Sequence, residues 1–260
     1  AEARSYYQDA LDHARRAADP EREGLALVGL GSAGSHTGEP DAMDRLLEGA
    51  ERLARHGAPT SAALAFYRVA LHARRIDAPG VAVVAAEVAR RIWAPRDPVR
   101  GQGQALRVLV KGLLAVGRGR AALVAAVTRE AIAGQVQPNA VAVADWIRAR
   151  APQEAVQELA PLPEMALLTR TASAMDRLLG PALEALDLRP ADLARPDKGL
   201  ALVQAAWNHA RGGGVDGSVV AVMVNGQTVE AGHGNGDGEA LQDPDREDTD
   251  EVAEPPSGGS

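Results

Sequence analysis

The sequence predicts an all-α fold in which antiparallel helix pairs stack as a solenoid, followed by a short C-terminal β-hairpin and a disordered acidic tail. Three observations predict it. An apolar pattern of helical spacing recurs after 36 residues, helical segments broken by Pro and Gly follow it, and the C-terminal part changes first to strand-like and then to acidic residues. We therefore divide the chain into helical repeats at 1–135, an irregular helical and capping region at 136–214, a β-hairpin at 215–233 and a disordered tail at 234–260.

The first predicted helix and its copy establish the repeat. Apolar residues at i, i+3, i+4 and i+7 mark one face of an amphipathic helix. In the first helix these are Tyr7, Ala10, Leu11, Ala14, Ala17 and Ala18, and adding 36 to each number gives Met43, Leu46, Leu47, Ala50, Leu53 and Ala54. The segments between these helices repeat as well, because Leu27, Leu30, Gly31 and Gly34 are followed 36 residues later by Ala63, Phe66, Tyr67 and Ala70.

A competing interpretation concerns Gly29, Gly31 and Gly34, which have the spacing of the dinucleotide-binding fingerprint GxGxxG. That fingerprint requires a strand before the glycines and a helix that opens at them, whereas Gly38 and Pro40 intervene before the next helical pattern. The repeat favours a helix here, with the glycines as positions of close packing. A nucleotide-cofactor enzyme that uses a Gly29–Gly34 loop is the less favoured alternative, and we expect no cofactor.

With Gly24 as the first residue of a unit, the large, Leu, Gly and aromatic signature positions fall on Leu27, Leu30, Gly31 and Gly34, and the turn glycine on Gly38. These residues resemble the tetratricopeptide repeat, a helix-turn-helix unit of about 34 residues. The resemblance covers about residues 1–135 and is divergent, as in the degenerate repeats of large bacterial regulators and signalling ATPases. It implies a stack of helix pairs whose first helices line a groove for a peptide or protein.

The C-terminal third of the sequence loses this period. Helical patterns broken by Pro and Gly continue to about residue 211 and are expected to cap the repeats. Asn225-Gly226 between two β-rich runs then predicts a hairpin at 218–231. Residues 234–260 hold nine acidic residues and one basic residue but almost no large apolar residue, so this tail is predicted to be disordered.

Composition narrows the function classes. The net charge of −7 comes from the tail, which carries −8, while the other residues carry +1, so nucleic acid is not an expected partner. The chain has no cysteine, no HExxH, P-loop or GxSxG motif, and no apolar run long enough for a membrane span. We expect a cytoplasmic protein that is not an enzyme and has no catalytic residue, metal site or membrane partner.

The resemblance also implies where a partner would bind. The helix face opposite the packed residues supplies the groove candidates Ser32, His36, Arg68, His72, Arg107 and Lys111, a set with cations and no carboxylate. Such a groove favours an acidic peptide or protein, because Arg binds carboxylates through two parallel hydrogen bonds. The chain's own acidic tail is one such candidate.

The predicted function is therefore a scaffold for protein–protein interaction. The alternative is a helical regulatory segment of a larger bacterial transcriptional or signalling regulator.

Overall fold

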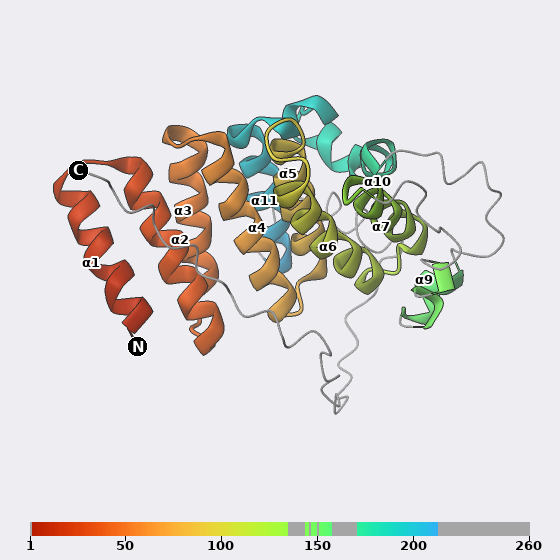
Figure 1. Ribbon diagram of the computed structural model, residues 1–260, viewed down its shortest axis with the longest axis horizontal. Helices are drawn as coiled ribbons and strands as arrows, with labels where there is room; N and C mark the ends of the chain where they lie inside the picture. The colour runs from red at the N-terminus through yellow and green to blue at the C-terminus, as the bar shows by residue number, and fades with distance from the viewer. Residues whose placement is uncertain (1, 135–143, 146, 150, 158–170, 213–260) are drawn as a thin grey trace. The chain divides into compact units, whose positions relative to one another are not determined.

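The computed structural model describes residues 2–134, 144–145, 147–149, 151–157 and 171–212, and these form helices and no strand (Figure 1). In chain order the elements are α1 (Glu2–Arg16), α2 (Pro20–Thr37), α3 (Ala42–His56), α4 (Pro59–Arg75), α5 (Pro79–Trp93), α6 (Arg100–Ala115), α7 (Gly119–Ile132), α9 (Gln153–Gln157), α10 (Thr171–Ala185), the 3₁₀ helix η2 (Pro190–Ala194) and α11 (Pro196–Ala210). Within the described residues the predicted all-α class is confirmed.

Local signals in the sequence explain where several helices begin and end. Proline lies in the first turn of α2, α4, α5 and α11, where its missing N–H and fixed φ do no harm. The side chain of Asp19 caps α2 by accepting a hydrogen bond from the backbone N–H of Arg22. The same helix ends at Gly38, whose φ of 73° places it in the left-handed region that glycine tolerates.

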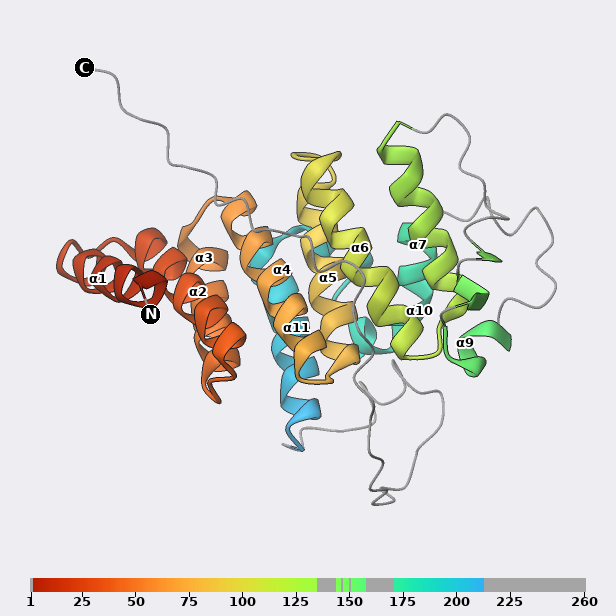
Figure 2. The same cartoon turned by 60° about the horizontal axis from the view of Figure 1, so that its bottom comes forward.

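Short connections make consecutive helices pack against one another from α1 to α7 (Figure 2). Helix α4 also contacts α2 on one side and α6 on the other, so these three first helices form one row. The two long helices of the segment predicted as a capping region pack in different places. Helix α10 packs on α7 and η2, whereas α11 packs on α3, α4 and α5, far from it in the sequence (Figures 1 and 2).

The helix starts correct the predicted period. The first helices of successive pairs start at Pro20, Pro59 and Arg100, and the second helices at Ala42, Pro79 and Gly119, so the spacing is longer than 36 residues. The hairpin predicted at 218–231 and the tail at 234–260 lie outside the described residues. A solenoid therefore stays a prediction, while the sequence of packed helices on which it would be built is observed.

A buried group of charged residues joins α5 to α10 and η2. Glu87 in α5 is 0% exposed, and its carboxylate accepts hydrogen bonds from Arg90 and Arg91. Arg91 also pairs with Asp176 of α10 and donates to the carbonyl oxygen of Pro190 in η2. Removing one partner of such a buried pair costs about 3–5 kcal/mol, because the other charge is left without compensation.

The glycines of the GxGxxG pattern lie inside α2 and not in a loop, which corrects the cofactor-loop alternative. Their backbone amides belong to a continuous helix and do not open toward a phosphate. A Cβ added at Gly31 would lie 2.7 Å from Leu46 Cγ and 2.9 Å from the backbone oxygen of Ala42, both in α3. Of the three glycines in the pattern, Gly31 is therefore the one at which α2 comes closest to α3. Close packing of the two helices explains why glycine occupies this position.

We predict that Gly31→Ala destabilises the protein, although Ala favours a helix by about 1 kcal/mol over Gly. The added methyl group must displace the α3 backbone, and overpacking of this kind costs about 1–3 kcal/mol. Gly103→Ala in α6 is the matched control, because a Cβ there meets nothing within 4 Å. Urea unfolding followed by circular dichroism should show opposite signs for the two variants, and equal stabilisation by both would contradict the close packing.

Candidate peptide-binding surface

The candidate residues lie along three neighbouring helices. Ser32 and His36 are on α2, Arg68 and His72 on α4, and Arg107 and Lys111 on α6. Spacing by three or four residues keeps each set along one side of its helix. We call this surface, made by these six residues and their neighbours on α2, α4 and α6, the α2–α4–α6 face.

The structure places the six residues at different depths. His36 is exposed, whereas Ser32, Arg68, Arg107 and Lys111 are partly buried. His72 is only 5% exposed, so its imidazole lies between the helices and is not presented on the surface. Of the two histidines assigned to the groove, one therefore faces solvent and the other supports the contact between α2 and α4.

A polar cluster joins the C-terminal halves of α2 and α4. Nδ1 of His72 lies 2.7 Å from Oγ of Ser35, and Nη1 of Arg75 donates to the same oxygen at 2.9 Å. Nη2 of Arg75 lies 3.4 Å from Nε2 of His36. The cluster thus brings together His36 and His72, which were predicted, and Ser35 and Arg75, which were not.

This geometry favours the neutral form of His72. Because Arg75 already donates to Ser35, the hydroxyl proton of Ser35 is available to Nδ1 of His72, which then accepts and carries no proton. Burial, and next the positive charge of Arg75, lower the pKa of His72 below its ordinary value of 6.5. The imidazole therefore serves as a neutral hydrogen-bond acceptor at neutral pH.

The opposite end of the face carries a carboxylate that the predicted set did not include. Glu21, in the first turn of α2, accepts hydrogen bonds from the backbone N–H of Ala58 and from Ser61 Oγ, at 3.1 and 3.4 Å. Between the two polar ends lie Leu25 and Leu64, which are 40% and 37% exposed. The face is therefore acidic at one end, apolar along part of its length, and cationic beyond.

Arg68 lies one helical turn from Leu64 and one turn from His72 on α4. It is partly buried, and its guanidinium makes no hydrogen bond or ion pair with any residue in the part of the chain that the structure describes. A guanidinium has five donors and no acceptor, so the chemically matched partner for Arg68 is a hydrogen-bond acceptor such as a carboxylate.

The sequence contains a signal for Leu25, Leu64 and Arg75, which the predicted set left out. A shift of 36 residues hides this signal, because it pairs the wrong positions of α2 and α4. When Pro20 of α2 is aligned with Pro59 of α4, Leu25 is paired with Leu64 and His36 with Arg75. This alignment matches the observed exposure, since His36 and Arg75 are both exposed while His72 is paired with an alanine. The first-turn prolines were thus the better markers of equivalent positions.

Other kinds of site find no support among the described residues. They contain no group of three or more His, Cys, Asp or Glu that could hold a metal ion. None of the helices formed by these residues is long and apolar enough to cross a membrane.

Comparison with family models, with curated proteins and with solved structures found no match to this chain. The resemblance to the tetratricopeptide repeat therefore stays a prediction.

We predict that acid weakens folding through His72. Because its pKa lies below 6.5 in the folded protein, the unfolded chain binds this proton first as the pH falls. The stabilising contribution is complete above pH 6.5 and is lost as the pH falls from there toward the folded-state pKa, by at most about 1.4 kcal/mol per pH unit. His72→Gln should flatten the dependence of unfolding free energy on pH between about 7 and 5.

The matched control for that titration is His56→Gln, which removes an exposed histidine from the last turn of α3. Urea titrations at several pH values should give this variant the slope of the unmodified protein. If His72→Gln and His56→Gln change the slope equally, the buried cluster is not the origin of the effect.

Proposed function

We propose that this chain is a helical-repeat scaffold that binds an acidic peptide or protein segment along the α2–α4–α6 face. The observation that carries the proposal is Arg68, a partly buried guanidinium whose donors are not used by any described residue. Charge-assisted hydrogen bonds from Arg to carboxylate are about twice as strong as neutral ones, and their planar geometry makes them selective.

The charge around Arg68 supports an acidic partner. Arg75 lies two turns further along α4, and Arg107 and Lys111 lie on α6, which packs beside α4. Glu21, the carboxylate described on this face, is at the far end and is engaged with Ala58 and Ser61. A peptide carboxylate near Arg68 therefore meets several cations and little repulsion.

The arrangement of helices also supports this face over the opposite one. Helix α11 packs against α3 and α5, the second helices of the first two pairs. It covers part of the side that faces away from the row formed by α2, α4 and α6. Among the described residues, α11 thus makes its main contacts with second helices, as expected if a groove lies along the first helices.

We predict that Arg68→Glu weakens binding of a fluorescein-labelled Asp/Glu-rich peptide about tenfold. One hydrogen bond to a charged group contributes about 1.5–3 kcal/mol when it is partly buried, and about 1.4 kcal/mol corresponds to a factor of ten. Fluorescence anisotropy at increasing salt measures the affinity, which should fall with ionic strength. A Lys-rich peptide of equal length tests the required sign of charge.

Arg177→Glu on α10 is the matched control. It changes the net charge equally at an exposed position whose helix packs on α7 and η2, away from α2 and α4. Circular dichroism should first show that both variants are folded. Equal affinity of Arg68→Glu and the unmodified chain, or equal losses in both variants, would rule out the α2–α4–α6 face as the binding surface. The double variant Arg107→Glu with Lys111→Glu extends the same test to α6.

A further inference from the structure

Helix α1 is attached to the rest of the described chain in a different way from the other repeat helices. Its apolar side chains pack on α2 in a small cluster separate from the main core, made by Leu11, Ala26, Leu27 and Leu30 with Tyr7 and Ala10 packed against it. The ring of Tyr7 lies directly over Gly29, since a Cβ at Gly29 would be 2.3 Å from Tyr7 Cδ1. Helix α1 therefore covers an apolar face of α2 with a shape that matches its own side chains.

Two ion pairs fix the register of α1 on this face. Arg4 pairs with Glu39 at 2.6 Å, and Arg15 pairs with Glu23 at 3.1 Å. Together Arg4, Tyr7, Leu11 and Arg15 form one stripe along α1, because their spacing brings them to the same side of a helix. A helix that replaces α1 needs this pattern of a cation at each end and apolar residues between.

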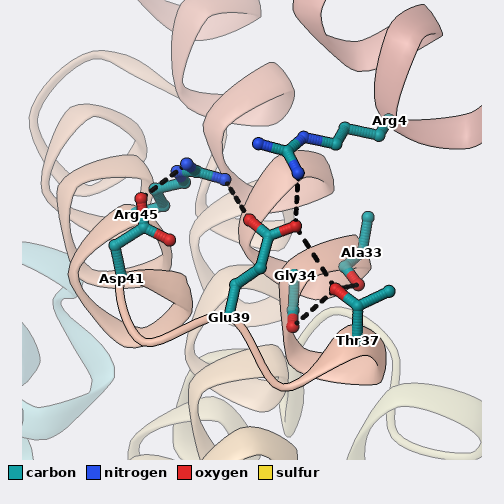
Figure 3. Close-up of polar contacts among 7 residues, drawn as sticks. All are labelled: Arg4, Ala33, Gly34, Thr37, Glu39, Asp41 and Arg45. Carbon is teal, nitrogen blue, oxygen red and sulfur yellow. Dashed lines mark hydrogen bonds and ion pairs between the residues drawn. The ribbon is translucent and has the colours of Figure 1, made fainter. Parts of the chain in front are cut away.

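The two carboxylates keep partners when α1 leaves. Glu39 also pairs with Arg45 of α3, and Glu23 with Arg52 of α3 (Figure 3 shows the Glu39 group). Both carboxylates are largely buried, and an unpaired buried charge would be costly. Since the α3 arginines remain, release of α1 leaves neither Glu23 nor Glu39 without a compensating cation.

The connection between α1 and α2 is closed by backbone hydrogen bonds, among them Asp19 N–H to the carbonyl oxygen of Ala14, but it holds one residue in a costly conformation. Only residues 17–19 separate the two helices, and Ala18 has a φ of 51°. This is the left-handed region, which Gly adopts freely but which L-residues other than Asn and Asp rarely adopt. Pro20 follows, so Asp19 is held extended and the two helices do not merge into one. Opening of this hinge lets Ala18 return to an ordinary conformation.

We propose that α1 exchanges between two copies of this chain, each α1 occupying the face of the partner's α2 in a reciprocal dimer. The exchanged dimer re-forms the same apolar contacts and ion pairs, and it removes the strain at Ala18, so that concentration decides between the two forms. A second copy is the occupant because its α1 carries the stripe of two arginines, Tyr and Leu that fits the site. The proposal is independent of peptide binding on the α2–α4–α6 face.

Because the natural chain has no cysteine, two single-cysteine variants report the exchange. One full-length chain carries Tyr7→Cys, and the other carries Gly29→Cys together with Tyr7→Ala. The second change is needed because the native Tyr7 ring would lie 2.3 Å from the new Cβ and would by itself displace that chain's own α1. Positions 7 and 29 lie close enough for a disulfide. The two are mixed at increasing concentration under reducing conditions and are then oxidised. We expect a disulfide-linked heterodimer on non-reducing gels whose fraction rises with protein concentration.

Two controls separate exchange from random collision and from misfolding. A mixture of Tyr7→Cys with Gly103→Cys places the second thiol on α6, away from α1. A single chain carrying both Tyr7→Cys and Gly29→Cys should close the disulfide within itself, which shows that the helix still docks. Exchange is overturned if the Tyr7→Cys and Gly29→Cys mixture links no more than the Gly103→Cys mixture does.

The hinge gives a second measurement that needs no cysteine. Ala18→Gly relieves the backbone in the closed form, so it should lower the heterodimer yield about fivefold when introduced into both single-cysteine chains. Deleting Ala17 and Ala18 from the natural chain should prevent α1 from folding back and convert the protein to a dimer by light scattering. A chain with this deletion that stays monomeric at high concentration overturns the proposal.

Discussion

The buried carboxylate of Glu87 is the constraint on which the described assembly most depends. A wholly buried charge is tolerated only with close counter-charges, and Arg90 and Arg91 of the same helix supply them. Arg91 then uses its remaining donors on Asp176 and on the carbonyl oxygen of Pro190. Arg91, held in place by Glu87, thereby ties α10 and η2 to α5, and η2 leads directly into α11.

The position of α11 bears on the proposed function, because α11 packs mainly on the second helices α3 and α5 and less on the first helices. With α11 packed on α3 and α5, the buried side chains of these second helices belong to the main core, while α3 keeps Asp44 and His56 exposed. The first helices α2 and α4 keep polar and apolar side chains toward the outside, including Arg68, Leu25 and Leu64. Under the proposed function, the first helix of each pair therefore binds the partner and the second contributes mainly to the core.

Much of the helical part could be predicted from sequence, because amphipathic spacing and first-turn prolines are local signals. The length of the repeat was harder to predict from sequence. A shift of 36 residues equals ten turns of about 3.6 residues, so it superimposes one helix face on another even when the helices start at different positions. This is why His72 was paired with His36, although it lies beneath the surface. The Ser35 and Arg75 contacts and the return of α11 depend on residues distant in the sequence, and periodicity contains no information about such contacts.

The return of α11 also bears on how this chain folds. In a linear array each unit touches only its neighbours, so units can fray from either end and folding can begin anywhere. Contacts of α11 with α3, together with the Arg211–Asp44 ion pair, close a loop that encloses α4 to α10. Closing it costs chain entropy early and raises the contact order, which slows folding. In return, we expect α3 to α5 and the C-terminal helix to unfold as one cooperative unit instead of separating repeat by repeat.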